Sequence, residues 1–338
     1  MHPTFRTIAL VLSSLFVTVQ ASATEAGFRQ MRVQSSPADA APITVALYYP
    51  TQAPARAIPM GLFTAHVAPG APADATLKGL LVLSHGQGGS EVGHSSLAEA
   101  LARHGYLVAS LRHPGDNFED RSLLQQSVAR YFTERPQHVS RVIDAVLADP
   151  EWGRRIAKDD RGPRIGALGH SAGGYTVLAL AGARPELSRN TTHCQDHRLE
   201  DPILCGIAAR GERPAPETAP IPTLEDTRVR AVAALSPLGV MFPAASLASV
   251  RIPVLIYEAE LDRFLVPRFH AEWIARNMPG AELRRVPNAW HFAFMDTPSR
   301  AIATEDGDLA ADPPGFDRAA FLAQLGQEIA IFFDKALR

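Results

Sequence analysis

The sequence predicts an α/β fold, in which a mostly parallel central sheet is flanked by helices on both faces. From Gly79 onward, short apolar runs bounded by Gly, Pro or Asp alternate with stretches of helical periodicity. Strands that alternate with helices imply crossover connections and a parallel sheet. Before Gly79, "FRQMRVQ" and "ITVALYYP" alternate apolar and polar residues, as two antiparallel strands do, and loops rich in Pro and Ala are expected to join and follow them. No internal repeat or convincing linker divides the chain, so we expect one domain.

The first 23 residues are predicted to be a secretory signal peptide. A short basic start ends at Arg6, the apolar run "TIALVLSSLFVTV" follows, and "ASA" at residues 21–23 precedes a cleavage site at Thr24. The apolar run is shorter than the ~20 residues needed to cross a bilayer; a retained N-terminal anchor is the alternative. We therefore expect residues 24–338 to form a single exported domain, periplasmic or secreted, without stable membrane insertion.

The first part of the parallel sheet is predicted between Gly79 and the middle of the chain. Its strands are short apolar runs bounded by Gly, Pro or Asp, and its helices show helix-like periodicity of apolar residues. In chain order, the strands and helices alternate as "GLLVLSHG", "SSLAEALARHG", "YLVASLRHPGD", residues 123–148 and "RIGALGHS".

A loop-like insertion is expected at about residues 184–227, after the helix that follows Ser171. It contains "RPAPETAPIPT", whose prolines fit neither a helix interior nor a central strand. The strand and helix pattern then resumes as "VRAVAALSP", "IPVLIYEAELD", a helix over residues 264–277, "AELRRVP" and an amphipathic helix over residues 318–337. We interpret the insertion as an excursion within one domain.

The overall composition is that of an ordinary globular protein. The 338 residues are 46% hydrophobic and 20% charged, and the formal net charge is −2. Such a balance gives no electrostatic reason to expect a nucleic acid or an anionic membrane surface as partner. The composition therefore favours a small-molecule enzyme or a binding protein, and its oligomeric state stays open.

Ser171 is the leading candidate nucleophile. It lies in the GxSxG pattern "GHSAG", between a predicted strand and a predicted helix. Such a turn holds its serine in a strained backbone conformation, and its glycines avoid clashes that a Cβ atom would cause. The spacing matches neither a P-loop nor a dinucleotide-binding fingerprint. We expect the turn to present the Ser171 hydroxyl at the carboxyl edge of the sheet.

A serine needs a base to take its proton and an acid to orient that base, and in this architecture both follow the serine in the chain. Three carboxylates follow the strand "PVLIY". Glu258 belongs to the strand end, Asp262 falls in the next loop and is our choice, and Glu260 is the close competitor.

Two histidines, His270 and His291, lie after these carboxylates. His270 falls within a predicted helix, where a surface or packing role is the usual one. His291 follows the strand "LRRVP" in the loop "NAWHFAF". We therefore predict His291 as the base.

The oxyanion of an acyl-transfer intermediate needs two hydrogen-bond donors. The backbone N–H of Ala172, just after the serine, supplies one. The glycines of "LLVLSHGQGGS" let the backbone approach a substrate, so the N–H of Gln87 is expected to supply the other. His85 could be a zinc ligand, but no second ligand lies near it at suitable spacing, and we interpret it as a structural residue.

Together these segments resemble the dienelactone hydrolase-like branch of the α/β-hydrolases, related to secreted platelet-activating-factor acetylhydrolases. The similar segments, in order over nearly all of the mature chain, are "VLSHGQGGS", "LARHGYLVASLRHPGDN", "GHSAGG", "LSPLGVMF", "IPVLIYEAELD" and "NAWHFAF". The resemblance implies the α/β-hydrolase fold and a carboxylic ester hydrolase without a cofactor. It assigns Ser171 as nucleophile, Asp262 as acid, His291 as base, and Gln87 with Ala172 as oxyanion donors.

The chain departs from this family in two respects. The glycine that the family often has just before the acid loop is absent, because residues 258–260 read "EAE". Dienelactone hydrolases proper use a cysteine nucleophile, so the serine argues against transferring that named activity.

The two cysteines, Cys194 and Cys205, both lie in the insertion. In an exported chain, two closely spaced cysteines are expected to form a disulfide. His193 and His197 make a zinc site imaginable, but the ligand spacing fits no common zinc motif. We therefore predict the disulfide and no metal.

Three classes of function remain open. The first is a serine esterase that acts on small or medium acyl esters, the second a serine peptidase of related fold, and the third a catalytically silent binding module. If the insertion leaves the sheet at the edge where Ser171 lies, it can roof an apolar pocket together with "PLGVMFPAASL" and Trp290. Phe292 and Phe294 are expected either to line this pocket or to fill the core. A pocket of finite volume favours acyl groups of up to about eight carbons.

Overall fold

The computed structural model describes residues 24–34, 41–210 and 221–338, and its core is one large sheet. In this part of the chain the sheet has ten strands. From one edge to the other they are β12 (Glu282–Val286), β11 (Val254–Ala259), β10 (Val229–Leu235), β9 (Ile165–His170), β5 (Leu80–Ser84), β6 (Leu107–Arg112), β2 (Ile43–Thr51), β1 (Glu25–Val33), β4 (Phe63–Pro69) and β3 (Arg56–Met60). The six strands from β12 to β6 are mutually parallel, and β2 joins them antiparallel.

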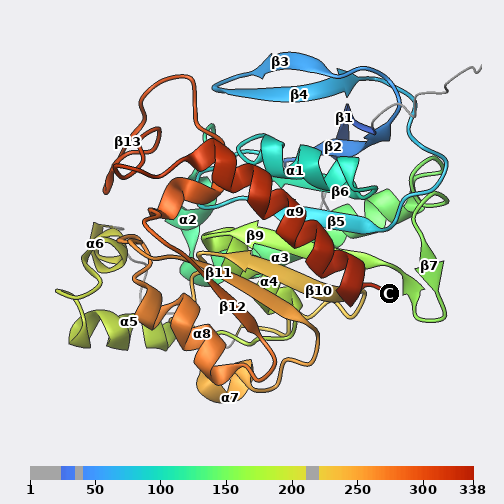
Figure 1. The fold of residues 1–338 in the computed structure, drawn as a ribbon. Helices are drawn as coiled ribbons and strands as arrows, with labels where there is room; N and C mark the ends of the chain where they lie inside the picture. The colour runs from blue at the N-terminus through green and yellow to red at the C-terminus, as the bar shows by residue number, and fades with distance from the viewer. Residues whose placement is uncertain (1–23, 35–40, 211–220) are drawn as a thin grey trace, which may run out of the picture.

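Helices cover both faces of this sheet, as Figure 1 shows. The α-helices are α1 (Ser95–Arg103), α2 (Ser122–Gln126), α3 (Val128–Ala148), α4 (Ala172–Leu180), α5 (Leu187–Asp196), α6 (Pro202–Arg210), α7 (Ala244–Leu247), α8 (Ala271–Asn277) and α9 (Arg318–Ala336). Helices α1 and α9 pack on one face, and α3, α4 and α8 on the other. This arrangement confirms the predicted α/β fold.

The position of strand β5 between two helical layers explains why its sequence is apolar throughout. All five of its residues are buried. Leu80 and Val82 point into the core beneath α3 and α4, whereas Leu81 and Leu83 point into the core beneath α1 and α9. Successive side chains of a strand face opposite sides, so a strand between two helical layers needs apolar residues at every position.

Several expectations from the sequence were wrong in detail. Residues 51–78 were expected to be loop, but they contain the hairpin β3–β4, in which Pro59 is tolerated because β3 is an edge strand. The stretch 123–148 is broken at Ser127, whose side chain accepts a hydrogen bond from the Arg130 N–H and caps α3. The helix expected from residue 264 begins only at Ala271, after a short 3-10 turn, Pro267–Phe269.

The insertion is more regular than its prolines suggested. It contains helices α5 and α6 where a loop was expected, because the proline-rich part follows these helices instead of interrupting them. Most of that part, residues 211–220, lies outside the described residues, as does the predicted signal peptide at residues 1–23. No helix within the described ranges has the length and apolar character needed to cross a bilayer.

Candidate active site

Ser171 lies at the turn between β9 and α4 in a strained backbone conformation. Its φ is 58° and its ψ is −117°, a region that non-glycine residues rarely adopt. A Cβ atom on Gly169 would lie 2.2 Å from the Gly173 carbonyl oxygen, and one on Gly173 would lie 1.9 Å from the Ser84 carbonyl oxygen. The two glycines are therefore required for the close approach of β9, α4 and β5 around this serine.

The loop after β5 lies against Ser171. A Cβ atom on Gly86 would lie 3.3 Å from the Ser171 Cβ atom. The next residue, Gln87, is exposed. Within the described ranges, neither the Gln87 N–H nor the Ala172 N–H has a hydrogen-bond acceptor. Both N–H groups are therefore available to a ligand next to Ser171.

Asp262 and His291 form a buried hydrogen-bonded pair. The His291 Nδ1 lies 2.7 Å from Asp262 Oδ2, and the two side chains are 2% and 1% exposed. The other carboxylate oxygen, Oδ1, accepts the backbone N–H groups of Phe264 and Leu265 at 2.9 Å each. An ionised carboxylate only accepts hydrogen bonds, so Nδ1 carries the proton and Nε2 is left as the basic nitrogen.

The competing carboxylates are bound elsewhere. Glu260 accepts the backbone N–H of Asn288 at 2.9 Å. Glu258 is buried in β11 and pairs with Arg285. The structure therefore brings Asp262 to His291 and keeps Glu258 and Glu260 on other partners.

His291 is held close to the serine turn by its neighbours. His170, the residue before Ser171, donates from Nε2 to the His291 carbonyl oxygen at 3.0 Å, and the two imidazole rings lie 4.8 Å apart. Phe264 stacks on the His291 ring at 5.1 Å. Phe292 contacts the rings of Phe264 and His291, whereas Phe294 is fully buried in the core. His170 was missed by the sequence reasoning, although its position next to Ser171 was a usable signal.

His85 has the structural contacts expected of it. Its Nδ1 lies 2.6 Å from the Gly86 carbonyl oxygen, and its Nε2 accepts the His113 N–H at 3.1 Å. The ring is therefore neutral, with the proton on Nδ1, and burial lowers its pKa to about 4. Among the described residues, no group of His, Cys, Asp and Glu side chains is arranged to hold a metal ion.

The predicted disulfide between Cys194 and Cys205 is present and joins α5 to α6. Beside it, Asp201 accepts hydrogen bonds from His193 at 2.9 Å and from His270 at 3.0 Å. Burial alone would raise the pKa of Asp201, but these two hydrogen bonds outweigh it and lower the pKa. His270 also accepts the Gly239 N–H at Nδ1, so it anchors the insertion to the body of the domain.

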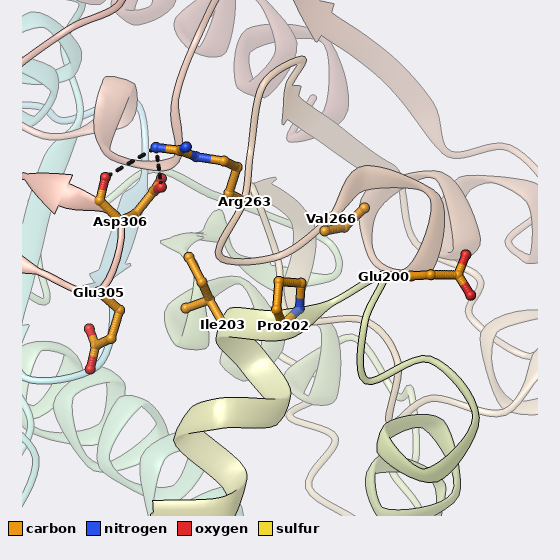
Figure 2. Close-up of a pocket in the computed structure, with 7 residues that line it drawn as sticks. All are labelled: Glu200, Pro202, Ile203, Arg263, Val266, Glu305 and Asp306. Atoms are coloured by element: carbon orange, nitrogen blue, oxygen red, sulfur yellow. Dashed lines mark hydrogen bonds and ion pairs between the residues drawn. The ribbon is translucent and has the colours of Figure 1, made fainter.

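A pocket of about 370 Å³ lies between α6, the Asp262 loop and the turn at residues 304–307. Its lining residues are Glu200, Pro202, Ile203, Arg263, Val266, Glu305 and Asp306. Figure 2 shows Arg263 and Asp306 facing each other at one side, with Ile203 at the start of α6 below them. Arg263 and Val266 follow Asp262 in the same loop, so the pocket lies beside the acid–base pair, whereas Ser171, Asp262 and His291 are not among its lining residues.

A serine in a strained strand-to-helix turn, with a buried His–Asp pair at the same edge of a parallel sheet, is typical of serine hydrolases. The chain belongs to the alpha/beta hydrolase family, whose model matches residues 81–305. A search of curated proteins found no match.

Two solved structures share the fold. A ferulic acid esterase from Streptomyces cinnamoneus is 22% identical, with a TM-score of 0.61 over 95% of this chain and 93% of that one. A dienelactone hydrolase from Anabaena variabilis is 15% identical, with a TM-score of 0.52 over 93% of this chain and 99% of that one. The family model shows the family, and the two structures show the same fold; the protein is a hydrolase.

Proposed function

We propose that this protein is a serine carboxylic ester hydrolase that acts through an acyl-enzyme on short to medium acyl esters. The observation that carries the proposal is the strained Ser171, whose neighbour His170 binds the His291 carbonyl oxygen, together with the hydrogen bond between His291 Nδ1 and Asp262. Among the described residues Nε2 of His291 has no hydrogen-bond partner, so it is available to take the serine proton. No observation favours the peptidase or the silent binding module.

In the first half of the reaction, the Ser171 hydroxyl oxygen attacks the ester carbonyl carbon while His291 Nε2 takes its proton. The carbonyl oxygen becomes an oxyanion, which accepts hydrogen bonds from the Gln87 and Ala172 N–H groups. The bond to the alcohol then breaks, and His291 returns the proton to the leaving alkoxide. Ser171 is left as an ester of the acyl group.

In the second half, a water molecule attacks the acyl-enzyme while His291 Nε2 takes its proton. The same donors hold the second oxyanion. When the intermediate collapses, the carboxylic acid leaves and Ser171 regains its proton from His291. Asp262 stays ionised throughout and stabilises the cationic form of His291.

The pocket beside Asp262 supports this substrate range. Its volume of about 370 Å³ is large enough for a small organic substrate. Pro202, Ile203 and Val266 contribute apolar lining, and Arg263, the one cation among the described lining residues, is paired with Asp306. Such a site favours an uncharged acyl or aryl group over a phosphorylated one. Helix α6 forms one wall, which limits long-chain and polymeric esters.

We also propose that residues 1–23 are a signal peptide removed before Thr24, that residues 24–338 form one domain, and that the mature protein is periplasmic or secreted. The Cys194–Cys205 disulfide supports export, because such bonds persist in oxidising compartments. The substrate is a small-molecule ester, and neither a nucleic acid nor a membrane is a partner.

One panel of substrates tests the proposed activity. We expect nitrophenyl esters of up to about eight carbons to be hydrolysed faster than longer ones, and nitroanilide peptides to be left intact, in keeping with a pocket of finite volume. A fluorophosphonate should label the protein at Ser171. Ser171→Ala should lower kcat by about 10⁴- to 10⁶-fold and abolish labelling.

The matched control is Ser249→Ala, which alters an exposed hydroxyl bound only to its own turn. It should leave both activity and labelling unchanged. A Ser171→Ala variant that keeps a tenth of the activity would refute the nucleophile. Activity that rises through long acyl chains, or jumps at a lipid interface, would indicate a lipase.

A further inference from the structure

A buried ion pair lies behind the two proposed oxyanion donors. Arg135, from α3, and Asp116, from the loop after β6, are 0% and 1% exposed, and Nη1 of Arg135 donates to Oδ2 of Asp116. A buried charge is tolerated when it is paired and its remaining hydrogen-bonding groups are also satisfied. The other hydrogen-bond partners of Arg135 and Asp116 therefore show which segments this ion pair holds in place.

The pair anchors the Gln87 loop on both sides of Gln87. Before it, Nη2 of Arg135 donates to the His85 carbonyl oxygen. After it, the Gly88 N–H donates to Oδ1 of Asp116 at 2.8 Å. The Gln87 N–H itself has no acceptor among the described residues. Its direction is consequently set by two anchors that belong to one ion pair.

The same arginine reaches the helix that carries the second donor. Nε of Arg135 donates to Oγ1 of Thr176 at 3.2 Å. The Thr176 hydroxyl donates in turn to the Ala172 carbonyl oxygen at 2.9 Å, in the first turn of α4. One guanidinium group is therefore connected to the segments of both Gln87 and Ala172.

We infer that Arg135, together with Asp116, is the positioning pair that fixes the two oxyanion donors relative to each other. This inference rests on the proposed esterase function. Neither residue touches the substrate. Oxyanion donors act only when they lie about 2.7–3.1 Å from the position of the developing charge. The planar guanidinium fork suits this task, because its donors keep fixed relative directions.

The test is the double variant Arg135→Gln/Asp116→Asn, which removes both charges and leaves no unpaired buried ion. Its substrates are an oxo ester and the thiono ester in which sulfur replaces the carbonyl oxygen. Sulfur is a weak hydrogen-bond acceptor, so a thiono ester gains little from the oxyanion donors. The ratio of the oxo ester rate to the thiono ester rate therefore measures how much these donors contribute. We expect kcat on the oxo ester to fall about 10²-fold, as after loss of one donor.

KM should change little in this variant, and the preference for the oxo ester should shrink in parallel with kcat. The matched control is Arg230→Gln/Asp159→Asn, which removes another Arg–Asp pair at the amino end of β10, away from the site. It should lower stability and leave the oxo to thiono ratio unchanged. Thr176→Val removes only the hydrogen bonds that connect Arg135 to Ala172. It should therefore reduce the oxo to thiono ratio less than the double variant does.

A folded double variant with the wild-type ratio would overturn the inference while leaving the esterase intact. If the double variant does not fold, the ratio measured for Thr176→Val decides, and an unchanged ratio overturns the inference. A wild-type protein that is inert toward both esters and toward a fluorophosphonate would instead overturn the proposed function, and the inference with it.

Discussion

At the residue scale, single backbone and side-chain positions define the site. Ser171 has a positive φ in a turn whose glycines cannot carry a Cβ atom. Strain of this kind costs on the order of 1–3 kcal/mol and persists only where the surrounding structure enforces it. Here three elements enforce it, because β5, β9 and α4 meet within contact distance at Gly169 and Gly173. The hydroxyl is thereby held at the edge where His291 and Asp262 meet.

The roles of the two loop carboxylates can be separated by mutation. Asp262→Asn keeps an oxygen for the Phe264 and Leu265 N–H groups, so the loop should stay in place. Its amide would favour the wrong tautomer of His291 and would not stabilise the cation. We expect kcat to fall about 10³- to 10⁴-fold.

The control for that change is Glu260→Gln, whose side chain caps only the Asn288 N–H. Its hydrolysis rate should equal that of the wild type in the same nitrophenyl ester assay. The opposite ranking of the two variants would transfer the role of the acid to Glu260.

At the element scale, the insertion is stabilised by a disulfide within it and by hydrogen bonds that connect it to the body of the domain. The disulfide joins α5 to α6, and Asp201 binds a histidine on each side of the boundary, His193 in α5 and His270 before α8. A surface excursion between β9 and β10 would otherwise gain little from the core. These anchors explain how α6 can form a stable wall of the pocket.

Removing the disulfide should loosen the insertion locally. The variant Cys194→Ser/Cys205→Ser opens a loop with a sequence separation of 11 residues. By the chain-entropy argument this costs about 3 kcal/mol. Hydrogen exchange should speed up more in α5 and α6 than in α3, which serves as the internal comparison. Equal protection of α5 and α6 in both proteins would contradict this prediction.

At the scale of the whole molecule, buried histidines make stability depend on pH. Burial lowers the pKa of His85 to about 4 and those of His94 and His138 to about 3. Below the unfolded pKa of about 6.5, the unfolded chain binds protons that the folded protein does not. Each histidine therefore removes about 1.4 kcal/mol per pH unit as the pH falls from 6.5 toward 4. Burial raises the pKa of Glu99 to about 7 and also raises those of Glu258, Asp296 and Asp306, which acts in the opposite direction. Burial lowers the pKa of two further histidines, His113 and His170, so among the described residues five histidines oppose four carboxyl groups.

We therefore expect the free energy of unfolding to fall between pH 6.5 and pH 5. Urea titrations at several pH values measure this slope. His94→Phe replaces a ring whose two nitrogens have no partner within the described ranges, and it should reduce the slope by about 1.4 kcal/mol per pH unit. His66→Gln, at an exposed position, is the control and should not change the slope. The same slope in His94→Phe and in the wild type would contradict the argument.

The sequence by itself determined the features whose causes are local. The α/β fold and the turn at Ser171 were predictable because strand, glycines and helix follow one another without interruption between residues 165 and 180. The disulfide was predictable because both cysteines lie in one short segment. The predicted residues Ser171, Asp262 and His291 follow three different strands, whose carboxyl ends must meet at one edge of a parallel sheet.

Only the tertiary structure decided the contacts made across long stretches of chain. Asp262 and Glu260 share one loop, so the sequence left both open, and what distinguishes them is a hydrogen bond to His291, 29 residues away. Arg135 carried no signal in its helix, because its partners Asp116, Thr176 and His85 are 19, 41 and 50 residues distant. A pattern along the chain reports the burial of a face, whereas the direction of a charged group depends on which elements the fold packs around it.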